Sequence, residues 1–283
     1  MSCRECQFAP NGATIAAQRW REGAGGTPVL ALHGWLDNAA SFIDLAPLLG
    51  ERELLALDLP GHGHSSHRHP PGSYNIWDDL LDLLAVADEL GWQRFDVLGH
   101  SRGALIAVLL AATMPERVRR LALLDAVWPM PVKAEEAPSI LRRYLQQQRQ
   151  AHAKAAPRYD TLEQAVAVRC RASSLDRAAA EPIVRRGIQV HPDGGLCWRT
   201  DPRLLLSSAF KLTQEHNRAF LAAVQAPVLV LLARHGFGGY PGIADALAAF
   251  AGVEVVFFDA GHHLHMGATA APVAAAITGF LDR

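Results

Sequence analysis

Lysine is scarce in this chain. It occurs only at positions 133, 154 and 211, so arginine supplies nearly all of the 27 basic residues. Because 28 acidic residues oppose them, the formal net charge is −1 at pH 7. Neither a basic patch nor an acidic tail stands out, so the charge pattern does not favour nucleic-acid binding. The preference for arginine over lysine suggests a GC-rich bacterial source.

Cysteine and long apolar stretches are also few. The four cysteines, Cys3, Cys6, Cys170 and Cys197, cannot build a disulfide scaffold in a chain of 283 residues. Cys3 and Cys6 have the spacing of a metal or redox pair, but no second pair completes a zinc site, and we expect no bound metal. The first ten residues are polar, unlike a signal peptide, and no apolar run is long enough to cross a membrane. We therefore expect a cytoplasmic protein that does not insert into membranes.

Short, largely apolar runs alternate with helical patterns in most of the chain. Pro10-Asn11-Gly12 predicts a hairpin turn near the N-terminus, and a helix is expected at Ser41–Leu49. Continuous apolar runs are typical of strands buried on both faces of a parallel sheet. The predicted strands are Pro28–Leu32, Leu54–Leu57, Phe95–Leu98, Val118–Leu124, Val228–Leu232 and Val253–Phe258. The alternation predicts an α/β fold with a doubly wound, mostly parallel sheet and right-handed crossovers.

The alternation stops between Val127 and Val224. This stretch is rich in Ala, Arg and Gln, is mostly helical in pattern and shows no clear buried strand, although residues 191–195 look like a loop. We predict three parts: residues 1–126 form the first part of a core, 127–225 form an inserted helical cap, and 226–283 complete the core.

The segment Gly99-His100-Ser101-Arg102-Gly103 carries the strongest chemical signal. It lies between a predicted strand and a predicted helix, and a sharp turn there would hold the Ser101 hydroxyl at its tip. Side chains at the two flanking positions would crowd such a turn, which explains the glycines. A serine nucleophile also needs a base, a group that orients the base, and donors for the oxyanion.

Position selects the base among 13 histidines. Gly261-His262-His263-Leu264-His265 follows the last predicted strand, where a loop can reach over the carboxyl edge of the sheet. We expect His262 to be the base, with His263 as the fallback. His263 and His265 are otherwise expected to pack or to bond to loop carbonyls.

Together these segments resemble the α/β-hydrolase fold superfamily, most closely its serine-hydrolase-like branch. Serine precedes histidine in the chain, as that superfamily requires. Leu32–Ala39, Asp58–Ser65, Gly261–Met266 and Trp198–Arg203 resemble its recurrent segments, and the resemblance covers nearly all of the chain outside the cap. Haloalkane dehalogenases and epoxide hydrolases share the fold but carry aspartate at the tip of the turn at Gly99–Gly103, which is called the nucleophile elbow. Ser101 therefore argues against both.

The acid of the triad is not where the resemblance places it. Most serine members carry it after the penultimate strand, but Gly236 stands at that position here. Asp125 ends the predicted strand next to the elbow strand, and some dehalogenases place their acid after the same strand. We therefore expect Asp125 to be the acid, with Asp245 and Asp259 as alternatives.

The resemblance implies that backbone amides form the oxyanion hole. One would belong to Arg102, directly after the nucleophile, and one to Trp35, in the loop after the Pro28–Leu32 strand. His33 is expected to hold that loop by hydrogen bonds. The Arg102 side chain is free, on sequence grounds, to be solvated or to contact a substrate carboxylate.

The expected function is hydrolysis of a carboxylic ester, or of a thioester or lactone, through a Ser101-His262-Asp125 triad and an acyl-enzyme. The substrate would be a small ester-like molecule, and neither a metal nor an organic cofactor is expected. Two alternatives stay open: the same site could perform C–C bond hydrolysis, perhydrolysis or cyanohydrin cleavage, or the chain could be a non-catalytic binding protein. The residues expected to line the substrate pocket are Trp128, Met130, Trp198 and Phe210.

Overall fold

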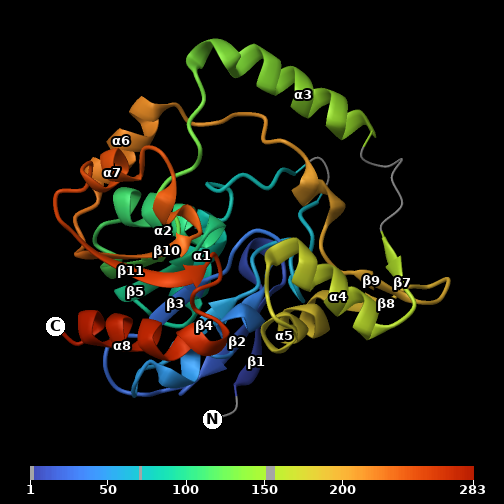
Figure 1. Cartoon of the computed structure of the whole chain (residues 1–283), viewed down its shortest axis with the longest axis horizontal. Coiled ribbons are helices and arrows are strands. Elements are labelled where there is room, and N and C mark those ends of the chain that lie inside the picture. The colour runs from blue at the N-terminus through green and yellow to red at the C-terminus, as the bar shows by residue number, and fades with distance from the viewer. Residues whose placement is uncertain (1–2, 70–71, 151–156) are drawn as a thin grey trace.

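The computed structural model describes residues 3–69, 72–150 and 157–283. In this part of the chain, eight strands form one sheet in the order β1-β2-β4-β3-β5-β6-β10-β11 (Figure 1). They are β1 (Arg4–Phe8), β2 (Ile15–Trp20), β3 (Val29–Leu32), β4 (Leu54–Leu57), β5 (Phe95–His100), β6 (Val118–Leu124), β10 (Val228–His235) and β11 (Val253–Gly261). Strands β1 and β2 pair antiparallel to each other and β2 to β4, while the remaining pairs are parallel. The mostly parallel sheet is therefore confirmed.

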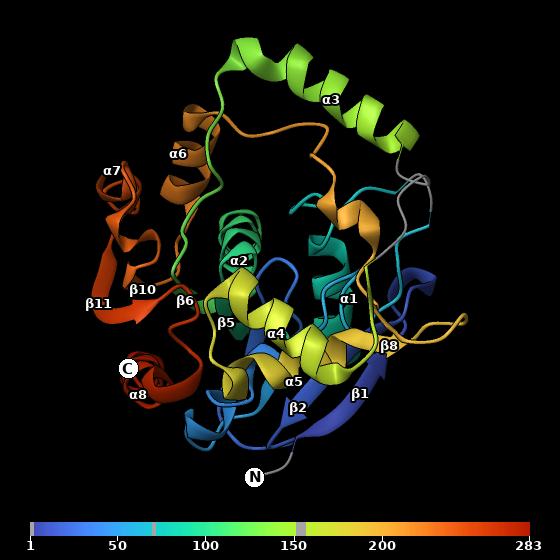
Figure 2. The same ribbon diagram turned by 45° about the vertical axis from the view of Figure 1, so that its right-hand side comes forward.

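Helices cover both faces of this sheet. Helices α1 (Leu80–Glu89), α2 (Arg102–Thr113), α6 (Gln214–Ala223) and α7 (Ile243–Leu247) contribute to one apolar layer, and α8 (Ala270–Leu281) packs in the opposite one. Figure 2 shows α2 and α8 on opposite sides of the strands. Successive side chains of a strand point to opposite faces, so alternate residues of a single strand enter the two layers.

The predicted helix at Ser41–Leu49 is wrong. Two short 3-10 helices, η2 (Ala39–Phe42) and η3 (Ala46–Leu48), replace it. The side chain of Asn38 accepts a hydrogen bond from the Ala40 amide and starts the first turn. Pro47 near the start of η3 has no backbone N–H, so a continuous helix would lack a hydrogen bond there.

The chain between β6 and β10 contains more than helices. It includes α3 (Ala137–Gln150), α4 (Leu162–Ser173), α5 (Arg177–Gly187) and α6, together with a three-stranded sheet of β7 (Arg158–Tyr159), β9 (Leu196–Trp198) and β8 (Ile188–Val190). The sequence does not predict this sheet, because strands of two or three residues carry no readable periodicity. The loop-like stretch at 191–195 is its turn, closed by a 2.9 Å hydrogen bond from the His191 amide to the Gly195 carbonyl. Residues 151–156 of the predicted cap lie outside the described residues.

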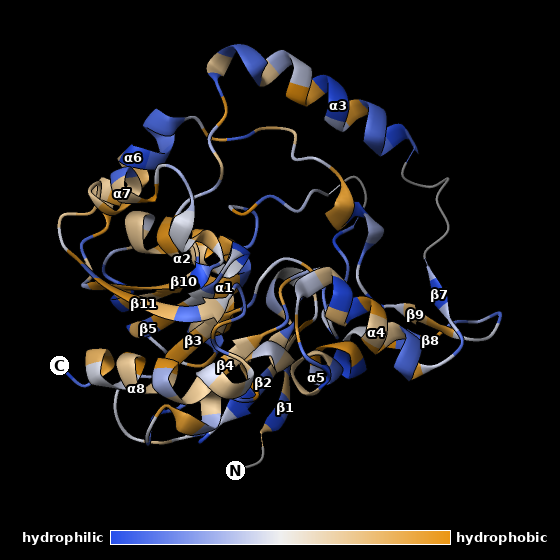
Figure 3. Ribbon diagram, viewed as in Figure 1, coloured by the Kyte–Doolittle hydropathy of each residue, from blue (hydrophilic) through white to orange (hydrophobic). Residues whose placement is uncertain are grey.

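Helix α3 stands apart from the sheet in Figures 1 and 2, and Figure 3 shows it as hydrophilic over most of its length. Of its side chains only Ile140 is buried. The helices described in the structure include none that is both long and apolar enough to span a bilayer.

Helices α4 and α5 attach to the core through two arginines. Arg169 of α4 forms an ion pair with Asp37, in the loop after β3. Arg186 of α5 pairs with Asp58 after β4, with 2.9 Å between Nε and Oδ1. All four residues are buried. Because a buried carboxylate is costly without a cation, these pairs fix where the two helices contact the core.

Candidate active site

Ser101 lies at the sharp turn between β5 and α2. Its backbone has φ 51° and ψ −117°, a conformation that non-glycine residues rarely adopt and that is characteristic of strained functional turns. The Ser101 amide donates a 3.0 Å hydrogen bond to the carbonyl of Leu124, at the end of β6. The turn is thereby fixed to the neighbouring strand, and the hydroxyl is held at the carboxyl edge of the sheet.

The two glycines of the elbow have no room for side chains. A Cβ at Gly99 would lie 2.6 Å from the Cα of Ala104, and a Cβ at Gly103 would lie 2.1 Å from the carbonyl oxygen of Leu32. The first contact brings helix α2 close to the end of β5. The second brings α2 against the end of β3, so the loop after β3 lies next to the elbow.

Three predicted site residues are brought together here. The Ser101 hydroxyl lies 2.8 Å from Nε2 of His262, and Nδ1 of His262 lies 2.7 Å from Oδ2 of Asp125. The imidazole is partly exposed, whereas the Asp125 carboxylate is fully buried. His262 comes directly after β11, and Asp125 directly after β6. The distances allow one continuous chain of hydrogen bonds, in which Ser101 donates to His262 and His262 donates to Asp125.

Backbone groups of the sheet fix Asp125. Its amide donates a 2.8 Å hydrogen bond to the Leu231 carbonyl of β10, and its carboxylate accepts from the amides of Ala233 and Phe237 at 2.9 and 3.0 Å. Its φ of 48° is a left-handed conformation that aspartate tolerates better than most side chains. Asp259 instead pairs with exposed His235, and Asp245 lies in the first turn of α7.

The amides expected to form an oxyanion hole lie in adjoining segments. Arg102 is the first residue of α2, so its N–H has no acceptor within the helix. Trp35 belongs to the loop after β3, and β3 pairs with β5 so that Leu32 is opposite Gly99. The Trp35 indole donates a 3.0 Å hydrogen bond to the carbonyl of Leu204. That contact holds the loop from its outer side.

Two buried histidines support the same loop. His33 Nδ1 lies 2.7 Å from the Gly34 carbonyl and its Nε2 accepts a 2.9 Å hydrogen bond from the Leu59 amide. His62 Nε2 accepts from the Leu36 amide at 3.3 Å. Burial lowers the pKa of His33 to about 4 and that of His62 to about 3, so both rings are neutral at pH 7. A neutral ring can donate from one nitrogen and accept at the other, as this loop requires.

The Arg102 side chain is neither solvated nor free for a substrate carboxylate. Its guanidinium pairs with the buried Asp79 at 2.8 Å and donates a 3.1 Å hydrogen bond to the Tyr74 carbonyl. The side chain therefore fixes the start of α2, and only the amide of Arg102 remains for the oxyanion.

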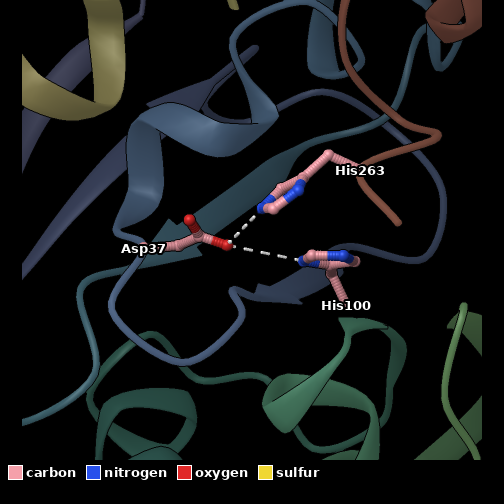
Figure 4. A group of neighbouring side chains, drawn as sticks. All are labelled: Asp37, His100 and His263. Carbon is pink, nitrogen blue, oxygen red and sulfur yellow. Dashed lines mark hydrogen bonds and ion pairs between the residues drawn. The ribbon is translucent and has the colours of Figure 1, made fainter. Parts of the chain in front are cut away.

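A second polar cluster lies behind the elbow and was missed in the sequence. Figure 4 shows Asp37 facing His263 and His100. Oδ2 of Asp37 lies 3.2 Å from His263 Nε2 and 3.6 Å from His100 Nδ1, so His263 bonds to a carboxylate rather than to a loop carbonyl. His265 packs beside His100 with ring centroids 4.3 Å apart. The one available signal was that Asp37, His100 and His263 each lie next to or within two residues of a predicted site residue.

Burial and neighbours set the charges of this cluster. Burial lowers the pKa of His100 to about 4. For Asp37 burial acts in the opposite direction, but the contacts with His263 and Arg169 outweigh it and hold its pKa well below the ordinary range. Among the residues that the structure describes, the three side chains in Figure 4 could together ligate a metal ion, since their candidate ligand atoms all lie within 4.8 Å of one another.

The expected pocket residues divide between two cavities and the core. Met130 and Phe210 line a cavity of about 440 Å³ together with Trp35 and Arg102. Trp198 lines a second cavity of about 780 Å³ and donates a 2.9 Å hydrogen bond to the Tyr159 hydroxyl. Trp128 packs against the apolar core. Met130 and Phe210 thus share a cavity with the two expected oxyanion residues, whereas Trp128 and Trp198 do not.

Comparison with known proteins identifies the family of the chain. A family model described as the α/β-hydrolase fold matches residues 27–173. A serine hydrolase-like protein of Danio rerio is 31% identical over 269 residues, which cover 91% of this chain and 82% of that protein. A serine hydrolase-like protein of Dictyostelium discoideum is 33% identical over 231 residues, and the match covers 78% of this chain and 63% of that longer protein.

Two solved structures extend the likeness over the whole chain. The crystal structure of a hypothetical protein from Pseudomonas aeruginosa has a TM-score of 0.94 and 42% identity, with 99% of both chains covered. An esterase of Mycobacterium tuberculosis has a TM-score of 0.75 and 25% identity, covering all of this chain and 92% of that one. The chain therefore belongs to the α/β-hydrolase family and is a hydrolase of that fold. Within the family it lies in the serine-hydrolase-like branch.

Proposed function

We propose that this protein is a serine hydrolase that cleaves carboxylic esters of small molecules through an acyl-enzyme. One observation carries the proposal: Ser101, His262 and Asp125 lie in a single hydrogen-bonded row, with successive distances of 2.8 and 2.7 Å. Nucleophilic catalysis by serine requires this order of nucleophile, base and orienting carboxylate.

The first half-reaction forms the acyl-enzyme. His262 Nε2 takes the proton from Ser101 Oγ while that oxygen attacks the ester carbonyl. Buried Asp125 holds the ring with Nδ1–H toward the carboxylate and stabilises the imidazolium. The same proton then passes to the leaving alkoxide, and the alcohol departs. In the second half-reaction His262 activates a water molecule, which attacks the acyl carbonyl and releases the acid.

The amides of Trp35 and Arg102 are proposed to bind the oxyanion of both tetrahedral intermediates. Donors fixed in position before the reaction need no reorganisation as the negative charge develops, and losing one typically lowers kcat by about 10²–10³-fold. Contacts from His33, His62 and the Trp35 indole support the loop that carries one of these amides.

The proposed substrate site is the cavity of about 440 Å³ lined by Trp35, Arg102, Met130 and Phe210. Its size suits a small molecule. We further propose that residues 127–225 act as one cap over the core, because they supply Met130 and Phe210 to this cavity. The resemblance to an esterase over the whole chain favours an ester as the substrate class.

Steady-state turnover of p-nitrophenyl acetate and butyrate tests the proposal. Wild-type protein should hydrolyse at least one of the two esters, and Ser101→Ala should lose turnover while retaining its circular dichroism spectrum and melting temperature. Turnover by Ser101→Ala equal to wild type would remove Ser101 from the mechanism. A folded wild-type protein without turnover of any ester in an acyl-chain series would favour a binding protein instead.

A further inference from the structure

Asp37 is in contact with all three segments that carry the proposed chemistry. It lies two residues after Trp35, whose amide is the proposed oxyanion donor. Its Oδ2 is 3.2 Å from Nε2 of His263, the residue after His262, and 3.6 Å from Nδ1 of His100, the residue before Ser101. Figure 4 shows the carboxylate facing both rings, with His263 approaching from the loop after β11.

His100 extends the contact to the backbone of the proposed base. Its Nε2 donates a 3.0 Å hydrogen bond to the carbonyl of His262, and the two rings have centroids 4.7 Å apart. His100 is fully buried, and in the described part of the chain its Nδ1 has no hydrogen-bond partner. Because Nε2 carries the proton of the neutral ring, Nδ1 is unprotonated, and Asp37 contacts it at 3.6 Å by packing rather than by a hydrogen bond.

The packing around Asp37 leaves little freedom. A Cβ at Gly34 would lie 2.7 Å from Oδ2 of Asp37 and 2.9 Å from Nδ1 of His100. The carboxylate and the ring thus fill the space that a side chain at position 34 would take. A shift of Asp37 would therefore move the loop that carries Trp35 as well.

The other carboxylate oxygen of Asp37 is bound from outside the core. Arg169 of helix α4 donates to Oδ1 of Asp37 and also donates a 3.1 Å hydrogen bond to the carbonyl of Leu36. Asp37 and Arg169 are both buried. One guanidinium therefore holds both the side chain and the backbone of the loop between Trp35 and Asp37.

Charge decides between a guanidinium and a metal ion as the cation of this cluster. Arg169 already neutralises Asp37, and His100 is uncharged at pH 7. A divalent ion among Asp37, His100 and His263 would leave two net positive charges in a buried place, and burying uncompensated charge is costly. The donor set alone would suit zinc. With Arg169 in place, we assign the cation of the cluster to the guanidinium.

We propose that Asp37 is a positioning residue that fixes the relative positions of the segments carrying Trp35, Ser101 and His262. We further propose that Arg169 makes this arrangement depend on the packing of helix α4 against the core. The inference rests on the proposed function, because it assigns a role at the same site. It also assigns the cap a part in catalysis beyond lining the pocket: α4 would stabilise the productive arrangement whenever it is docked.

Arg169→Ala tests this coupling, with Arg186→Ala as a matched control. Both variants remove a buried ion pair between the cap and the core, but only Arg169 is linked to His263 and His100. Arg169→Ala should lower kcat for p-nitrophenyl butyrate on the order of 100-fold, since misplacing a reacting group by about 1 Å costs about that much. KM should change far less. Arg186→Ala should lower the melting temperature and keep kcat near that of wild type.

Added guanidinium separates a positioning role from a structural one. Arg169 lines the cavity of about 780 Å³, so free guanidinium can reach the place of the deleted group. At concentrations that do not unfold the protein, it should raise kcat of Arg169→Ala and leave Arg186→Ala unchanged. The conservative variant Arg169→Lys should retain an intermediate kcat, because lysine keeps the charge but not the two-pronged contact.

Asp37→Asn completes a double-mutant cycle with Arg169→Ala. If the two residues act as one unit, the double variant should lose no more kcat than the worse single variant. The inference would be overturned if the loss of kcat in the double variant equalled the product of the two single losses. An unchanged kcat in Arg169→Ala, or a loss of kcat that guanidinium does not restore, would also overturn it. So would a loss of wild-type activity on EDTA treatment that zinc reverses.

The proposed function is tested separately, by ester turnover in wild type and its absence in Ser101→Ala. If wild type turns over esters and Ser101→Ala does not, a normal kcat in Arg169→Ala refutes the coupling alone. If wild type has no turnover, it is the proposed function that fails.

Discussion

The carboxylate of Asp125 fills the space into which a side chain at Gly236 would project. A Cβ at position 236 would lie 2.1 Å from Asp125 Oδ2. Strands β6 and β10 are parallel neighbours, so their carboxyl ends place the two positions side by side. The glycine at the usual position of the acid and the aspartate on the neighbouring strand are therefore structurally complementary. An acid at one position requires a small residue at the other.

Gly236→Ala should disturb the acid without touching Ser101 or His262. The new methyl group would push the Asp125 carboxylate away from His262, and we expect kcat to fall on the order of 100-fold, as for other displacements of about 1 Å. Gly239→Ala is the matched control in the same turn, because among the described residues a Cβ there would meet one atom, the Arg234 carbonyl oxygen at 4.0 Å. Equal kcat values for the two variants would show that the contact with Asp125 does not matter.

The acid should be transferable between the two strands. Asp125→Ala removes it, and adding Gly236→Asp to that variant supplies a carboxylate from β10 into the vacated space. We expect the double variant to recover part of the kcat lost in Asp125→Ala, since the carboxylate again faces His262 Nδ1. Measurement of kcat for both variants checks this. A folded double variant no faster than Asp125→Ala would contradict the equivalence of the two positions.

Asp125→Asn should preserve the packing and lower kcat by about 10⁴-fold, the usual cost of losing the acid of a triad. The amide cannot stabilise the imidazolium as the carboxylate does. Asp245→Asn and Asp259→Asn serve as controls, because Asp259 pairs with exposed His235 and neither faces His262 in the structure. A larger loss in either control than in Asp125→Asn would move the acid to that residue.

Stability should fall as the pH drops below about 6.5, the ordinary pKa of histidine. Burial lowers the pKa of His33 to about 4, of His62 to about 3 and of His100 to about 4. These residues stay neutral in the folded protein while the unfolded chain binds protons. Stability is therefore complete above pH 6.5 and is lost as the pH falls toward these values, by up to about 1.4 kcal/mol per pH unit for each residue.

Urea unfolding between pH 7 and pH 5 measures this loss. In His62→Gln the side chain can still accept a hydrogen bond from the Leu36 amide but cannot bind a proton. The free energy of unfolding of this variant should therefore fall less steeply with decreasing pH than that of wild type. A stability that does not vary over this range would contradict the neutral, buried state of the three rings.

Local signals in the sequence predicted well where one short segment determines the geometry. Gly99, Ser101 and Gly103 define the elbow within five residues, and the apolar runs define the parallel strands. The prediction of a helix at Ser41–Leu49 was wrong because Pro47 and the Asn38 side chain impose short turns on a helical pattern. Locally encoded turns can override periodicity over such a short span.

Contacts between distant segments were the part that the sequence left open. The link from Arg169 to Asp37 joins residues 132 positions apart, and that from Asp37 to His263 joins residues 226 apart. No local sequence pattern predicts a contact between residues so far apart in the chain. The role of Gly236 was equally hidden, because its meaning depends on a carboxylate from another strand. The sequence showed only that position 236 lacks the carboxylate that most serine members carry there.

Labelling with a fluorophosphonate tests whether Ser101 is an activated nucleophile. The reagent forms a stable adduct with an activated serine, and intact mass followed by peptide mapping locates it. We expect one adduct per chain, on Ser101, that is absent in Ser101→Ala and forms much more slowly in Asp125→Asn. Folded wild-type protein that forms no adduct, or forms one at another residue, would contradict the assignment of Ser101 as the activated nucleophile.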